Sequence, residues 1–221
     1  MLVCCLMLPL AVGEDQSATE VRQPVNAEQA LQILKAGNLR FVRGQSQHPH
    51  ESNHWRRQLV DGQKPIATIL GCSDSRVTPE LIFDEGLGDL FVIRVAGNIV
   101  DEDVTASIEY AVEHLDTHLV VVLGHENCGA VTAAMQQLDE KEPKELSSLV
   151  RRLHDSIFEH HDGEPDVMAG TQISTAVCKN VMCGARKLSE CPDLCLCMKK
   201  HKVKIVGAIY DLETGQVRWI D

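Results

Sequence analysis

The chain has 221 residues, of which 44% are hydrophobic and 24% are charged. This composition is that of a globular protein and excludes a disordered or wholly membrane-embedded chain. The length suits one α/β domain, whose folding removes roughly 70% of the surface from water. The formal net charge is -11, and no run of Lys or Arg offsets it, so we expect no nucleic-acid partner.

The first 24 residues are expected to lie outside the folded domain, which we place at residues 25–221. Met1–Gly13 is apolar, too short to span a membrane, and ends in a small-X-small pattern. It resembles a signal peptide. No Lys or Arg precedes the apolar run, so a truncated or mis-started N-terminus stays open. We expect a periplasmic or secreted protein without stable membrane insertion, with a cytoplasmic location as the alternative.

Helical and strand patterns alternate along the rest of the chain. Helices are expected at about 26–42, 55–60, from 79, 103–115, from 130, 146–157 and 171–200, the last broken at Pro192. Strands are expected at Ile66–Leu70, Leu90–Val95, Leu119–Leu123, Val203–Tyr210 and Gln216–Ile220. The pattern predicts an α/β fold: a mostly parallel central sheet of four parallel strands plus an antiparallel C-terminal edge strand, flanked by helices.

One polar segment invites a metal-binding interpretation before the first strand. It carries three close histidines, His48, His50 and His54. No thiol stands nearby in the sequence to complete a ligand set, so we expect a solvated loop.

Chemically active side chains follow two of the predicted strands directly. Cys72 comes after an apolar run that ends in Gly71, and His125 and Cys128 come after the run that ends in Gly124. Functional groups gather beyond the carboxyl ends of parallel strands, so these side chains can converge. Two thiolates and one imidazole form a zinc ligand set that leaves one tetrahedral position for water, as catalytic zinc requires.

A carboxylate and a guanidinium stand beside the first thiol, at Asp74 and Arg76. The carboxylate can accept a hydrogen bond from zinc-bound water while the guanidinium keeps it ionised and oriented. If Asp74 turns away from Arg76, it can instead become the fourth zinc ligand and close the site.

The motif GCSDSR, followed 53 residues after its Cys by the His-X-X-Cys of HENCGAV, resembles the β-class carbonic anhydrase family. The resemblance extends from about Leu31 to the C-terminus through GNLRFVRG, DGQKPIATIL, GDLFVIRVAGN, ASIEYAV and VGAIYDLETG. It implies one zinc(II) per subunit, bound by Cys72, His125 and Cys128, and an Asp74–Arg76 gating dyad. The implied reaction is the reversible hydration of carbon dioxide to bicarbonate and a proton by zinc-bound hydroxide.

The same resemblance implies roles for further residues. Gln63 matches a glutamine that hydrogen-bonds substrate. A narrow carbon dioxide pocket is implied at Phe91, Ala96, Tyr110 and Gly129. The family also implies a homodimer with pockets at the subunit interface, often assembled into tetramers.

Other interpretations stay open at this stage. The same site could hydrolyse carbonyl sulfide or carbon disulfide, or the chain could be a non-catalytic zinc-binding module. A phosphatase that used Cys72 as its nucleophile would need an Arg six residues after it, whereas Arg76 is only four residues after it. Five further thiols depart from the family pattern and are expected to pack in helices rather than to form a second metal site: Cys178, Cys183, Cys191, Cys195 and Cys197.

Overall fold

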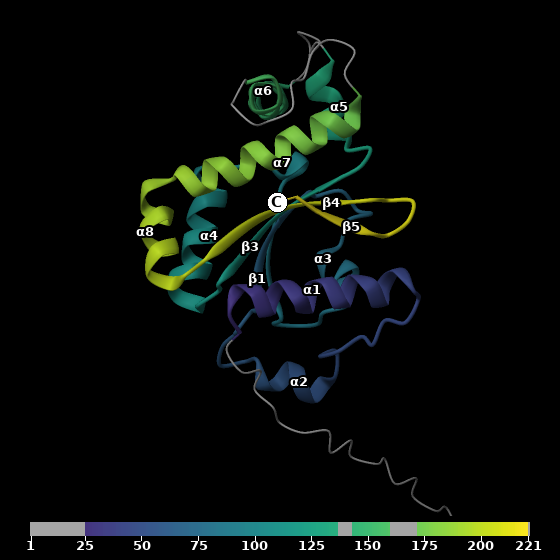
Figure 1. Ribbon diagram of the computed structural model, residues 1–221, viewed down its shortest axis with the longest axis vertical. Helices are drawn as coiled ribbons and strands as arrows, with labels where there is room; N and C mark the ends of the chain where they lie inside the picture. The colour runs from purple at the N-terminus through teal and green to yellow at the C-terminus, as the bar shows by residue number, and fades with distance from the viewer. Residues whose placement is uncertain (1–24, 137–142, 160–171, 221) are drawn as a thin grey trace, which may run out of the picture.

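The computed structural model describes residues 25–136, 143–159 and 172–220, and the predicted alternation of helices and strands is confirmed there (Figure 1). The strands are β1 Ala67–Gly71, β2 Leu90–Arg94, β3 Leu119–His125, β4 Lys204–Tyr210 and β5 Val217–Ile220. The helices are α1 Ala27–Val42, α2 Asn53–Gln58, α3 Pro79–Ile82, α4 Glu102–Leu115, α5 Gly129–Met135, α6 Lys144–Phe158, α7 Ile173–Glu190 and α8 Pro192–His201, with a 3-10 turn, η1, at Ala96–Asn98. The predicted signal peptide in residues 1–24 lies outside the described residues and stays a prediction.

The sheet has the order β2-β1-β3-β4-β5. Strands β2, β1, β3 and β4 pair in parallel, and β5 pairs antiparallel with β4. The predicted mostly parallel sheet with an antiparallel C-terminal edge strand is therefore confirmed. Every residue of β1 and β3 is buried, as expected for central parallel strands that helices cover on both faces.

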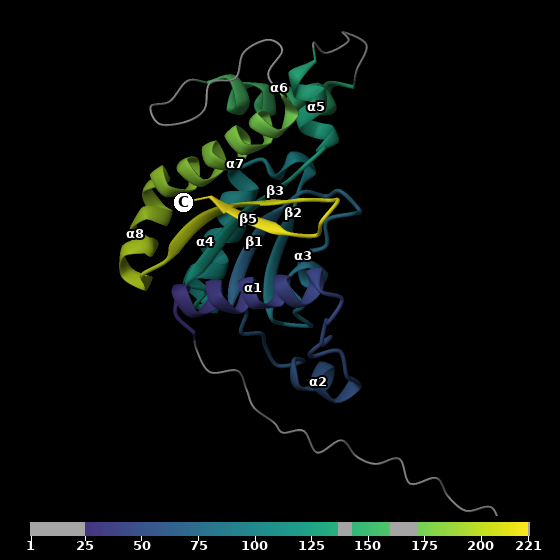
Figure 2. The ribbon, with the colours of Figure 1, turned by 45° about the vertical axis from the view of Figure 1, so that its right-hand side comes forward.

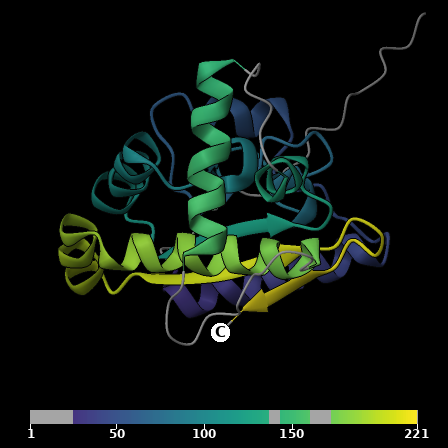
Figure 3. The ribbon, with the colours of Figure 1, turned by 90° about the horizontal axis from the view of Figure 1, so that it is seen from above.

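Two hydrophobic clusters fill the space on the two faces of the sheet. Successive strand side chains point to opposite faces, so Ile69 belongs to the cluster under α1 and α3, while Leu70 belongs to the cluster under α4, α6 and α7. Figure 2 shows α1 on one side of the strands and α4, α7 and α8 on the other. Seen from above, α6 lies outermost and runs steeply away from α7, with one end against it (Figure 3).

Local capping chemistry explains where the first long helices begin. Asn26 accepts a hydrogen bond from the Gln29 N–H, and the Gln29 side chain accepts one from the Asn26 N–H. This reciprocal pair of bonds is a capping box. Asp101 caps α4 by accepting from the N–H of Val104.

In the part of the chain that the structure describes, no helix combines the length and apolarity that crossing a bilayer requires.

Helix α1 contacts the α3 segment more closely than most side chains would permit. A Cβ at Gly37 would lie 1.7 Å from the carbonyl oxygen of Phe83. The absence of a side chain at Gly37 therefore lets α1 pack directly against this backbone.

Candidate metal centre

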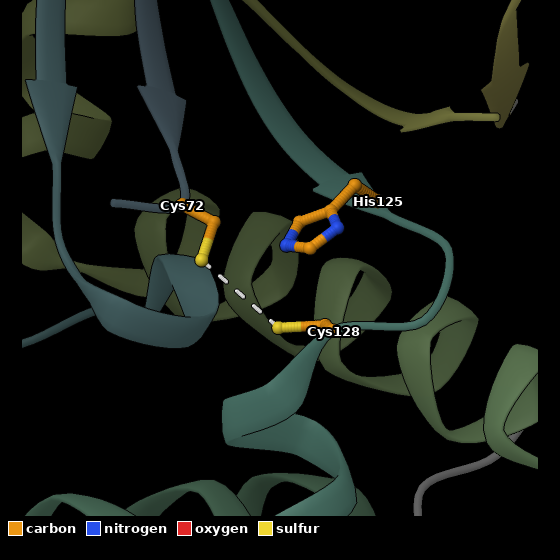
Figure 4. Close-up of side chains that lie close together, drawn as sticks. All are labelled: Cys72, His125 and Cys128. Carbon is orange, nitrogen blue, oxygen red and sulfur yellow. Dashed lines mark hydrogen bonds between the residues drawn. The ribbon is translucent and has the colours of Figure 1, made fainter. Parts of the chain in front are cut away.

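The candidate site lies where the adjacent strands β1 and β3 end at the same edge of the sheet. Cys72 follows β1, His125 is the last residue of β3, and Cys128 is the N-cap of α5. All three side chains are buried and converge on one point (Figure 4). The predicted convergence of residues 53 positions apart is confirmed, because parallel pairing in register brings Gly71 beside Leu123.

The three ligand atoms have a spacing that suits a single metal ion. They all lie within 4.8 Å of one another, and the two sulfur atoms are 4.0 Å apart. In a tetrahedral zinc site with Zn–S bonds of about 2.3 Å, two sulfurs are separated by roughly 3.8 Å. The observed sulfur separation therefore needs little adjustment to hold zinc.

The imidazole is oriented as a metal ligand requires. The Nδ1 atom of His125 lies 2.9 Å from the carbonyl oxygen of Glu126, and a carbonyl can only accept, so Nδ1 carries the proton. The other nitrogen, Nε2, is buried without a hydrogen-bond partner among the described residues. A buried acceptor left alone is costly. A cation bound between the two thiols would satisfy it, so the donor set fits zinc.

The thiols of Cys72 and Cys128 differ in pKa. A hydrogen bond between the sulfurs of Cys72 and Cys128 lowers the pKa of Cys72 and raises the pKa of Cys128. The pair thus gives up its first proton readily and holds the second. A divalent cation would replace that second proton and hold both groups as thiolates.

Asp74 and Arg76 form an ion pair beside the thiols and imidazole. The guanidinium donates from Nε to Oδ1 at 2.9 Å and from Nη2 to Oδ2 at 2.7 Å. These bonds hold the pKa of Asp74 well below its usual range, with burial opposing the shift. The carboxylate oxygen Oδ2 also lies 3.9 Å from Nε2 of His125. An ionised carboxylate therefore faces the position where a cation would bind.

Two supporting contacts were not predicted from the sequence. Arg94 donates to the carbonyl oxygens of Cys72 and Asp74, at 3.1 and 2.7 Å. The N–H of Gly97 donates to the sulfur of Cys72 at 3.2 Å. The register of the strands could have indicated the role of Arg94, because Arg94 on β2 pairs with Gly71 on β1, directly before Cys72.

The structure separates the remaining predicted site residues into two groups. Ala96 belongs to the turn that contacts Cys72, and Gly129 directly follows Cys128. Gln63 instead lies before β1, in a pocket of about 320 Å³ with Gly88 and Asp89, which precede β2. That is the opposite end of the parallel strands, separated from Cys72 by the length of β1, about 17 Å.

The aromatic residues of the implied pocket also lie away from the metal ligands along the strand. Phe91 is the second residue of the edge strand β2, and its ring is 6.2 Å from that of Tyr110 on α4. Tyr110 is half exposed, at 49%. Gln63, Phe91 and Tyr110 therefore do not surround the metal centre of their own chain.

The sequence profile of the family described as "Carbonic anhydrase" matches residues 67–217, which include all three candidate ligands. The chain belongs to the carbonic anhydrase family. A carbonic anhydrase of Pseudomonas aeruginosa is 33% identical over 196 residues, covering 84% of this chain and 85% of the relative.

The relative named carbonic anhydrase 2 of Mycobacterium tuberculosis is 54% identical over 115 residues. That match spans about half of each protein, 52% of this chain and 56% of the relative. Among solved structures, tetrameric β-carbonic anhydrases of Sordaria macrospora superimpose with a TM-score of 0.65 at 26% identity, covering 77% of this chain and 88% of theirs. The fold is therefore that of the β-class carbonic anhydrases.

Proposed function

We propose that this protein catalyses the reversible hydration of carbon dioxide to bicarbonate and a proton, with one zinc ion held by Cys72, His125 and Cys128. The observation that carries the proposal is the buried, unpartnered Nε2 of His125 between two thiols, beside an ionised carboxylate. The chemistry that zinc supplies when bound to three protein ligands is Lewis-acid activation of a water molecule near neutral pH. Membership of the carbonic anhydrase family supports this reaction class.

Asp74 and Arg76 are proposed to orient and gate this chemistry. The ionised carboxylate of Asp74 accepts a proton or hydrogen bond from the attacking water, and Arg76 keeps the carboxylate charged and turned toward itself. Without that guanidinium, Asp74 is close enough to His125 to enter the ligand set. Arg76 would thus keep Asp74 apart from the three residues that would hold the metal.

The proposed functional unit is a homodimer or a larger homo-oligomer. Gln63, Phe91 and Tyr110 lie away from the metal ligands of their own chain, although the family resemblance gives them contact with substrate. A second copy could bring its own Gln63 to the first copy's metal centre. The named Sordaria relatives are tetrameric, which supports assembly of this kind.

One purified sample tests the proposal if zinc content and carbon dioxide hydration are both measured on it. We expect one zinc per chain and hydration activity, with both lost in Cys72→Ala, His125→Ala and Cys128→Ala, because two remaining ligands bind the metal far more weakly. The matched control is Cys183→Ala, which removes a buried thiol of α7 and should keep both. Activity that survives Cys128→Ala but not Cys72→Ala would instead indicate a thiol nucleophile.

A further inference from the structure

The turn η1 presents a backbone N–H to the candidate metal centre. Gly97 donates this N–H to the sulfur of Cys72, 3.2 Å away and buried. Such a bond orients a thiolate and stabilises its charge, as outer partners do for metal ligands in general. The direction of the N–H therefore matters for how Cys72 meets a metal.

The backbone of this turn has an uncommon conformation. Gly97 has φ 70° and Asn98 has φ 43°, so two successive residues occupy the left-handed region, which L side chains rarely adopt. A Cβ at Gly97 would also lie 2.7 Å from the side chain of Leu153. The turn needs external support to keep this shape while it is packed against α6.

That support comes from α7, 83 residues further along the chain. The Nδ2 atom of Asn180 donates to the carbonyl oxygen of Gly97 at 2.8 Å, in a fully buried bond. Asn180 itself is 3% exposed, and α7 packs on β3 and β4. The amide therefore ties the carbonyl of Gly97 to a rigid helix.

We propose that Asn180 is a positioning residue for the metal-binding sulfur of Cys72, acting through the backbone of Gly97. The carbonyl that Asn180 holds and the N–H that contacts sulfur lie in the two peptide planes that meet at the Cα of Gly97, so the bond to Asn180 fixes one plane and restricts the backbone rotation that sets the direction of the N–H. The inference rests on the proposed metal centre and goes beyond it, because Asn180 is not one of the three candidate ligands. The alternative is that Asn180 only attaches α7 to the sheet and affects stability alone.

Cobalt(II) binding to the full chain separates these roles, because thiolate-to-cobalt absorption reports the sulfur ligands directly. Asn180→Asp keeps the shape of the side chain but places an acceptor against the Gly97 carbonyl, and Asn180→Ala removes the donor without adding charge. We expect both variants to bind cobalt about tenfold more weakly, the lower end for lost outer-shell partners. We also expect their charge-transfer band to shift in position or intensity.

Asn38→Asp is the matched control. Asn38 is also a buried amide that bonds backbone atoms, donating to the carbonyls of Ile82 and Gly215 and accepting from the N–H of Val217. It lies on α1, on the other face of the sheet. We expect this variant to lower the melting temperature and leave cobalt affinity and spectrum unchanged.

Unchanged cobalt affinity and spectrum in Asn180→Ala would overturn the positioning role, and so would an equal shift in Asn38→Asp. If Asn180→Asp does not fold, Asn180→Ala alone decides. A wild-type protein that binds neither cobalt nor zinc would remove the proposed metal centre itself and this inference with it.

Discussion

Asp74 is the residue at which proton chemistry and metal binding meet in the candidate site. Its carboxylate is held by Arg76 and lies 3.9 Å from the ligand nitrogen of His125. Asp74→Asn should keep one zinc per chain and lose about 10²-fold in hydration rate, because a neutral amide cannot take a proton. Zinc analysis and stopped-flow hydration across pH test this together. Rates equal to wild type at every pH would contradict the assigned role.

Single residues also show how far the sequence could predict the site. The ligands Cys72, His125 and Cys128 were predictable because each comes after an apolar run in the sequence, and parallel strands end at one edge. The contacts of Gly97 and Asn180 were not, because they depend on how α7 lies over a turn 83 residues earlier. No local pattern encodes that crossing.

At the scale of elements, α1 depends on one close approach. Gly37→Ala would place a Cβ 1.7 Å from the Phe83 carbonyl, so α1 and the α3 segment must separate. We expect a loss of about 2–4 kcal/mol in unfolding free energy, in the range of severe overpacking. Urea denaturation measures it. Gly62→Ala, where no atom lies within 4 Å of the added Cβ, is the control and should change little. Equal stability of the two variants would show that α1 can shift without cost.

A buried carboxylate ties the loop before α2 to α1. Asp84 pairs with Arg40 and accepts from the N–H groups of Gln47 and His48. Burial raises the pKa of Asp84, but these bonds outweigh it and leave the pKa below its ordinary value of 3.8. A carboxyl with a lowered folded pKa stabilises the fold above its unfolded pKa and loses that contribution as pH falls through the folded pKa.

Asp84→Asn should therefore reduce stability at pH 7, and the difference from wild type should shrink as pH falls below about 4. Thermal unfolding of both proteins at a series of pH values checks this. Asp61→Asn, at an exposed loop position, is the control and should follow wild type throughout. A difference that stays constant down to pH 2 would mean that the lost shape, not the lost charge, sets the cost.

The same loop shows a limit of local sequence patterns. His50 was expected in a solvated loop, yet its Nδ1 lies 2.6 Å from Oδ2 of Asp89 and its ring stacks on Trp55 with centroids 3.8 Å apart. The carboxylate that His50 contacts lies far away in the sequence. Asp89 comes 39 residues later, where the chain turns into β2.

At the scale of the whole molecule, the mostly parallel sheet and the edge that carries the metal ligands follow from the alternation of helices and strands. The separation of the predicted pocket residues into two groups does not follow from that alternation. Ala96 and Gly129 lie beside the metal ligands, whereas Gln63 lies at the other end of β1. Spacing along the chain shows which residues match the family and gives no information on which copy of the chain they serve.

Mixing two inactive variants tests whether Gln63 serves a second copy. Gln63→Ala keeps its metal ligands and loses the glutamine, while Cys72→Ala keeps the glutamine and loses a ligand. In a mixed dimer, the intact metal centre of the first subunit would meet the intact Gln63 of the second, restoring one site in two. Unfolding and refolding equal amounts of the variants together should then recover about a quarter of wild-type activity, because about half of the dimers are mixed and each mixed dimer has one restored site in two. Size-exclusion chromatography reports the oligomer. The controls are each variant refolded alone. If the mixture is no more active than the sum of its parts although mixed dimers form, Gln63 does not act across subunits.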